Sequence, residues 1–237
     1  MPPTAHRDIY VLITGYGPFF STTHNPSYYA AKPLNRTQIS LPGGRITIHL
    51  TVIEVQAPIA RPAPGPARPP ASVTDAPSPP AGGYDFIFHL GQGRAGAFYV
   101  ETLGHQTGYN QQDVNGELAP VMDIKEAGKV LRGAGKRYQD CESVLRTGIE
   151  VGKLVKHLKL TDDKVLQSHD AGRYLCDFIF YCSLAEAQLA KEEQRAQSAR
   201  KVLFMHVPPA GLPHTLDEMT QMIRHVVSWV VIDHIDN

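Results

Sequence analysis

The sequence predicts a three-layer α/β/α sandwich in a single domain, with a mainly parallel central sheet. Apolar runs of strand length alternate along the chain with longer stretches of helical periodicity, and this order is typical of parallel sheets covered by helices. The chain has 237 residues, of which 42% are hydrophobic and 19% charged, so it can bury one sizeable core. We therefore expect residues 1–237 to form one α/β domain.

Five segments have the composition of strands, because they are short and rich in aliphatic or aromatic residues. They are residues 9–14, 45–55, 84–90, 164–167 and 201–206. Helical patterns predict four helices, at residues 26–34, 148–158, 174–189 and 216–232. Asn25 followed by Pro26 is typical of an N-cap and a first helical residue. The last helix carries a stripe of Met, Ile and Val, which indicates core packing.

Cys176 lies near the start of the helix expected at 174–189, after a turn at Ala171 and Gly172. The amides of a helix N-terminus and a neighbouring imidazole favour the thiolate form of cysteine, which is a strong nucleophile. The same amides could receive an oxyanion, and Ser168 or Asp170 could cap the helix. The alternative is a small core residue, as we expect for Cys182.

His206 ends the strand expected at 201–206 and stands just before Val207 and two prolines. Catalytic groups in open α/β sheets gather outside the carboxyl ends of strands, so His206 is placed to act as a base. The alternative is a structural histidine that only binds backbone groups.

Motifs at both ends and in the middle of the chain occur together. The pattern S-x-D-A-G-x-Y-L-C-D-x-x-x-Y covers residues 168–181, and F-M-H-V-P-P follows at 204–209. V-L-I-T-G-Y-G-P-F stands at 11–19, H-L-G-Q at 89–92 and E-T-L-G-H at 101–105. In this order, the motifs resemble the pyroglutamyl peptidase I (pyrrolidone carboxyl peptidase) family of cysteine peptidases, in its animal and fungal branch.

The resemblance implies an omega exopeptidase that removes N-terminal pyroglutamate (5-oxoproline) from peptides through an acyl-enzyme. By the matching motifs, Cys176 would be the nucleophile and His206 the general base and acid. Glu101 would be the carboxylate that orients the imidazole. The resemblance also implies that peptides with N-terminal pyroglutamate are the partners of this chain.

The resemblance further implies a substrate pocket. Tyr16 and Phe19 match the aromatic positions that bind the lactam ring, and Gln92 matches a position that contacts the lactam in bacterial members. A small neutral lactam requires an apolar pocket with a few fixed polar groups. Tyr16 stands where the family usually has Phe, so its added hydroxyl needs a partner.

Two segments depart from the family. Residues 57–80 replace a connecting helix and contain nine prolines, so we expect a loop or a disordered segment there, with a P-x-x-P match at 66–69. Residues 102–119 lack the arginine with which bacterial members help to bind the oxyanion, so backbone amides must supply most of that support. These departures keep one alternative open, a catalytically silent relative that binds pyroglutamyl peptides or a protein partner.

A competing motif stands at residues 91–96, where G-Q-G-R-A-G matches the dinucleotide-binding pattern G-x-G-x-x-G. That pattern requires a helix to begin at its third glycine. Residues 98–100 instead lead into several glycines and asparagines, which indicates a loop. The eleven histidines show no H-E-x-x-H spacing and the cysteines no C-x-x-C spacing, so we expect neither a cofactor nor a metal.

Composition excludes other classes of protein. Lys plus Arg and Asp plus Glu balance at 23 each, which gives no electrostatic reason to expect nucleic acid or a membrane surface as partner. Three cysteines without framework spacing favour a reducing compartment. Because the sequence also has no apolar signal core or spanning segment, we expect a cytoplasmic protein. The oligomeric state stays open.

Overall fold

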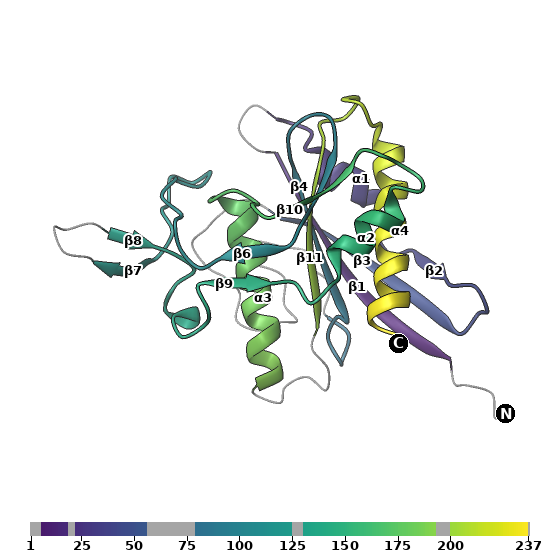
Figure 1. Ribbon diagram of the computed structural model, residues 1–237, viewed down its shortest axis with the longest axis horizontal. Helices are drawn as coiled ribbons and strands as arrows, with labels where there is room; N and C mark the ends of the chain where they lie inside the picture. Colours follow the sequence, from purple (N-terminus) through teal and green to yellow (C-terminus); the bar gives the residue numbers. More distant parts are fainter. Residues whose placement is uncertain (1–5, 19–21, 56–78, 125–129, 193–199, 237) are drawn as a thin grey trace.

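The computed structural model describes residues 6–18, 22–55, 79–124, 130–192 and 200–236. Its centre is a seven-stranded sheet with the strand order β10-β5-β11-β4-β1-β3-β2 (Figure 1). Four strand pairs are parallel, and only β5 with β11 and β2 with β3 are antiparallel, so the prediction of a mainly parallel sheet is confirmed. The strands are β1 Arg7–Tyr16, β2 Gln38–Ser40, β3 Ile46–Val55, β4 Phe86–Gln92, β5 Phe98–Glu101, β10 Val165–Ser168 and β11 Lys201–Val207.

Helices cover both faces of this sheet, which confirms the three-layer architecture (Figure 1). α1, α2 and α4 lie on one face, where they share a core with alternate residues of the strands. α3 lies on the other face and forms a second core with the remaining strand residues. The helices are α1 Pro26–Ala31, which continues into a 3-10 turn at Lys32–Leu34, α2 Val151–Leu158, α3 Leu175–Glu192 and α4 Leu216–His234.

Capping groups fix the ends of two helices. Asn25 is the N-cap of α1, as predicted, and its side chain accepts a hydrogen bond from the amide of Ser27, while Pro26 takes the first helical position. α4 begins with a capping box in which Thr215 and Glu218 each bind the other's backbone amide. These local signals position the helices on the first face of the sheet.

The segment after Gly96 is the strand β5, which the sequence did not predict. β5 pairs with β10 on one side and with β11 on the other, and its residues Phe98 and Val100 are buried. Both partner strands lie more than 60 residues further along the chain, so local sequence gives little sign of them. No helix begins at Gly96, and the structural context of a dinucleotide site is therefore missing from this described segment.

Two small sheets extend from the α3 side. β6, at Leu103–His105, pairs with β9, at Val144–Arg146. β7, at Val121–Ile124, pairs with β8, at Val130–Arg132. The sequence did not predict these four short strands.

Most of the proline-rich segment expected at 57–80 lies outside the described residues, which resume at Pro79. Of the helices within the described ranges, none has the length and apolar character that crossing a bilayer requires.

Candidate active site

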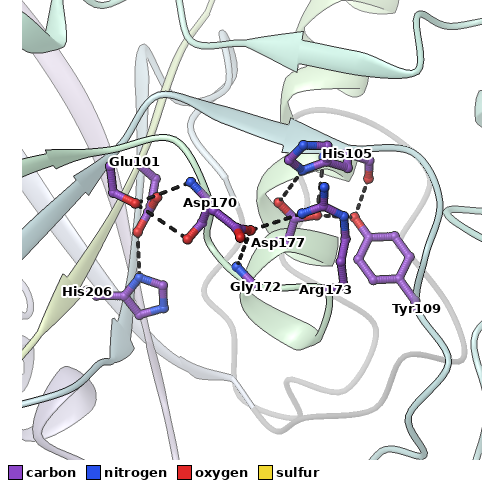
Figure 2. Close-up of polar contacts among 9 residues, drawn as sticks. Glu101, His105, Tyr109, Asp170, Gly172, Arg173, Asp177 and His206 are labelled. Atoms are coloured by element: carbon purple, nitrogen blue, oxygen red, sulfur yellow. Dashed lines mark hydrogen bonds and ion pairs between the residues drawn. The ribbon is translucent and has the colours of Figure 1, made fainter.

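Glu101 and His206 lie on the neighbouring antiparallel strands β5 and β11. Glu101 stands opposite Phe204, so His206, two residues further along, is its diagonal neighbour on the same face of the sheet. The Oε1 of Glu101 is 2.8 Å from the Nδ1 of His206 (Figure 2). The carboxylate side chain is only 1% exposed and the imidazole 13%. Because Glu101 occupies Nδ1, the other ring nitrogen, Nε2, is left for a second partner.

Cys176, the second residue of α3, is partly exposed and lies close enough to His206 for its thiol to raise the pKa of the imidazole. The structure thus brings Glu101, His206 and Cys176 together from β5, β11 and α3. The position of the thiol in the first helical turn also places it beside amides that have no partner within the helix.

The pKa of His206 is strongly shifted. Burial alone lowers the pKa of His206. The hydrogen bonds with Cys176 and Glu101 and the charges of these two groups raise it by more, so the pKa moves from 6.5 to about 10. The imidazole is therefore protonated at neutral pH and faces two acidic groups. Cys182 differs, because burial raises the pKa of its thiol well above the ordinary value, and it lies in the core as predicted.

Two glycines on either side of Gln92 make room for the thiol and the imidazole. A Cβ atom at Gly91 would lie 2.8 Å from the ring of Phe204 and 3.0 Å from the sulfur of Cys176. A Cβ atom at Gly93 would lie 2.8 Å from the Cβ of His206. These distances are below ordinary carbon contacts of about 3.5 Å, so any larger residue would push the two groups aside.

Tyr16 and Gln92 line a cavity of about 140 Å³ at the carboxyl ends of β1 and β4. Tyr16 is buried, and its hydroxyl donates a hydrogen bond of 3.0 Å to the carbonyl of Leu175, the first residue of α3. The hydroxyl that the sequence left without a partner therefore has one, and burial raises the pKa of Tyr16 well above its ordinary value, so it stays a donor. Phe19 lies outside the described residues.

Sequence reasoning missed four residues that also line this cavity. They are Thr22, Asn25, Tyr174 and Leu175. The last two directly precede Cys176 in the chain, and this adjacency could have identified them. Asn25 was expected only as a helix cap.

The residue after Cys176 is the centre of a buried polar network (Figure 2). Asp177 is fully buried and accepts hydrogen bonds from the backbone amide of His105 at 3.2 Å and from the hydroxyl of Tyr109 at 2.8 Å. Its other oxygen lies 3.1 Å from the Nδ1 of His105. Burial raises the pKa of Asp177, although these hydrogen bonds oppose the shift. The network joins the segment after Glu101 to the first turn of α3.

The loop before α3 is closed by Asp170. Its Oδ1 accepts hydrogen bonds of 3.0 Å from the amide of Gly172 and from the guanidinium of Arg173 (Figure 2). The side chain of Ser168 binds the backbone of Asp170. The prediction that Ser168 or Asp170 caps α3 is therefore wrong, since both act before the helix begins at Leu175.

Comparison with known proteins gives a consistent set of relatives. No protein-family model matches the chain. Over 220 residues it is 27% identical to pyroglutamyl-peptidase 1 of Mus musculus, a match that covers 92% of this chain and 87% of the relative. The match to pyroglutamyl-peptidase 1 of Homo sapiens has the same identity and the same coverage.

Solved structures agree on the fold. The pyrrolidone carboxyl peptidase of Pyrococcus furiosus superposes with a TM-score of 0.66 at 15% identity, covering 95% of this chain and 99% of that one. The pyrrolidone carboxyl peptidase of Thermococcus litoralis gives 0.66 at 19% identity, covering 96% and 95%. The predicted fold and the resemblance indicated by the motifs are both confirmed.

Proposed function

We propose that this chain, a relative of the pyroglutamyl peptidase I enzymes, is a cysteine exopeptidase that removes N-terminal pyroglutamate from peptides. The observation that carries the proposal is the arrangement of Glu101, His206 and Cys176 beside a small cavity lined by Tyr16 and Gln92. A thiol, an imidazole and a carboxylate in this arrangement form, respectively, a nucleophile, its base and the group that orients the base.

In the first half of the reaction, Cys176 acts as the thiolate, with its proton carried by Nε2 of His206, and the sulfur attacks the carbonyl carbon next to the lactam ring. The C–N bond of the scissile amide breaks, and Nε2 of His206 gives its proton to the leaving amine. Water then adds to the thioester and passes a proton to His206, and the C–S bond breaks to release pyroglutamate. Glu101 holds the imidazole by Nδ1 throughout and stabilises its protonated form.

The cavity beside Cys176 suits a small neutral ring. Tyr16 supplies an aromatic wall, and the amide of Gln92 can both donate to and accept from the lactam. Amides of the first turn of α3 are the oxyanion donors we propose, each worth roughly 3 kcal/mol in other enzymes. Nothing in this scheme requires the arginine that residues 102–119 lack.

A fluorogenic assay tests the proposal. Wild-type protein should release aminomethylcoumarin from its pyroglutamyl amide, and Cys176→Ala should lower kcat/KM by about 10⁴-fold or more, because no other group can form the acyl-enzyme. Iodoacetamide should inactivate the wild type, since the thiol of Cys176 is partly exposed.

Cys141→Ala is the matched control, because Cys141 is also partly exposed, while burial raises the pKa of its thiol. This variant should keep full activity. Full turnover by folded Cys176→Ala would contradict the assignment of the nucleophile. Folded wild type that binds pyroglutamyl peptides without turnover would instead favour the catalytically silent alternative.

A further inference from the structure

A second and larger cavity opens beside the candidate triad, on the side of His206. It has a volume of about 480 Å³, and Glu101, His206, Gly93, Arg94 and Tyr99 are among its lining residues. The smaller cavity with Tyr16 and Gln92 is separate from it. Gln92 lines the smaller cavity and the next residue, Gly93, lines the larger one, so both cavities lie at the carboxyl end of β4.

The direction of a bound peptide follows from the proton that His206 must deliver. The amine that leaves belongs to the residue after pyroglutamate, and it must lie within reach of the imidazole to accept this proton. With the lactam ring against Tyr16 and Gln92, the next residue lies on the His206 side. The larger cavity is therefore where the side chain of that residue would lie.

The acidic groups around this cavity are paired with cations, but one of its cationic groups has no acidic partner within the described part of the chain. Glu101 pairs with His206 at 2.8 Å, and Asp170, which also lines the cavity, pairs with Arg173 at 3.0 Å. Both carboxylates thus have a cationic partner. Arg94 has no ion-pair partner among the residues that the structure describes.

Arg94 is also held in place. Its guanidinium carbon lies 4.5 Å from the centre of the Tyr99 ring, and its Nε donates a hydrogen bond of 2.8 Å to the Tyr99 hydroxyl. The hydrogen bond uses only the Nε donor of Arg94 and fixes the orientation of the guanidinium group. Its two terminal nitrogens can then donate to an acceptor on a bound peptide. A carboxylate fits that fork in two parallel hydrogen bonds.

We propose that this larger cavity accepts the residue that follows pyroglutamate, and that Arg94 makes the site favour an acidic side chain there. The inference rests on the proposed peptidase function and adds a substrate preference to it. It concerns selectivity between peptides, since Arg94 has no part in the bond-breaking steps.

Competing peptides test the preference. For the wild type, kcat/KM should be about three- to five-fold higher for pyroglutamyl-Glu-amide than for pyroglutamyl-Gln-amide, as expected for a partly exposed ion pair. Arg94→Gln should bring this ratio close to one. Arg94→Glu should instead favour pyroglutamyl-Lys-amide. All three proteins should still release aminomethylcoumarin, because Arg94 takes no part in the bond-breaking steps.

Arg224→Gln is the control for net charge, because it removes one positive charge, as Arg94→Gln does. Arg224 lies on α4, which covers the face of the sheet opposite to α3. This variant should keep the wild-type ratio. Equal kcat/KM values for the Glu and Gln peptides, or an unchanged ratio in Arg94→Gln, would overturn the inference while coumarin release still supports the peptidase. Absence of turnover with every substrate would overturn both.

Discussion

The charge on His206 depends on two neighbours that reach it from different elements. Glu101 approaches Nδ1 from β5, and Cys176 approaches from α3. Their hydrogen bonds and charges outweigh burial and raise the pKa of His206 to about 10. Since the folded pKa exceeds 6.5, the protonated imidazole stabilises the fold fully below pH 6.5 and loses this contribution as pH rises towards 10. The imidazole should thus remain a proton donor across neutral and mildly alkaline pH.

Replacing Glu101 by glutamine should reveal this dependence in the pH profile. In the wild type, kcat/KM should fall at high pH with an apparent pKa near 10, the value of His206. Glu101→Gln removes a charge that favours the imidazolium, so the alkaline limb should move to lower pH and kcat/KM at pH 7 should drop by about 10² to 10⁴. Steady-state rates of coumarin release between pH 6 and 10.5 measure both effects.

Glu150→Gln serves as the control, because Glu150 is an exposed carboxylate before α2. Its profile should match that of the wild type. If Glu101→Gln also keeps the wild-type profile, Glu101 does not set the charge on His206.

At the scale of elements, β1 holds the start of α3 through one side chain. The hydroxyl of Tyr16, the last residue of β1, binds the carbonyl of Leu175 directly before Cys176. Tyr16→Phe should lower the free energy of unfolding by about 1 kcal/mol, because it removes a buried hydrogen bond between β1 and α3. Since the aromatic wall of the cavity remains, kcat/KM should stay within about two-fold of the wild type. Urea denaturation and the fluorogenic assay measure these effects.

Comparison of Tyr16→Leu with Tyr16→Phe separates the effect of the ring from that of the hydroxyl. Tyr16→Leu removes both groups and Tyr16→Phe only the hydroxyl, so KM should be several-fold higher for Tyr16→Leu. A KM equal to that of Tyr16→Phe would contradict the placement of the lactam ring against this wall.

The sequence predicts the long elements well and the short ones poorly. β1, β4 and β11 contain continuous apolar runs, because both faces of a central parallel strand are buried, whereas β3 alternates apolar residues with Thr and His over most of its length. β5 is only four residues long, and glycines follow it closely. Its strand conformation comes from pairing with β10 and β11, which a local pattern cannot reveal.

The candidate site also has a part that the sequence predicts and a part that it does not. Motifs predict Cys176, His206 and Glu101, which the structure brings together. They do not predict the larger cavity or the position of Arg94 over Tyr99, because these depend on how the β4–β5 connection packs. Asp177 lies in a quoted motif, yet its contacts with His105 and Tyr109 appear only in three dimensions.

At the scale of the whole molecule, one buried histidine joins the sheet to α3. His89 on β4 is hydrogen-bonded to Thr14 of β1 at 2.7 Å and to Ser183 of α3 at 2.8 Å. Burial lowers the pKa of His89 from 6.5 to about 3. Because the folded pKa lies below the unfolded one, the neutral ring supports the fold above pH 6.5, and this support is lost as pH falls towards 3.

Acid should therefore destabilise the wild type more than a variant without this histidine. Between pH 7 and pH 4.5, His89 should account for about 2 to 3 kcal/mol of the loss in unfolding free energy. His89→Gln should show a shallower fall of Tm over this range, whereas His225→Gln, which changes an exposed histidine of α4, should follow the wild type. Thermal unfolding at a series of pH values measures the slopes.

An NMR titration of the wild type provides a test that does not depend on the variant folding. The ring protons of His89 should keep their neutral chemical shifts down to about pH 4. Titration of His89 near pH 6.5 in the folded protein would contradict this account.

The glycines around Gln92 have a consequence for how such sequences are read. G-x-G after a buried strand is usually interpreted as a loop that lets a pyrophosphate approach the backbone. Here the hydrogens of Gly91 and Gly93 face the thiol of Cys176 and the ring of His206. The same G-x-G spacing can therefore meet two unrelated requirements, a close approach of the backbone to a ligand or a close approach of the backbone to other side chains. What distinguishes them is the element that follows, which is a helix in the first case and the strand β5 in this protein.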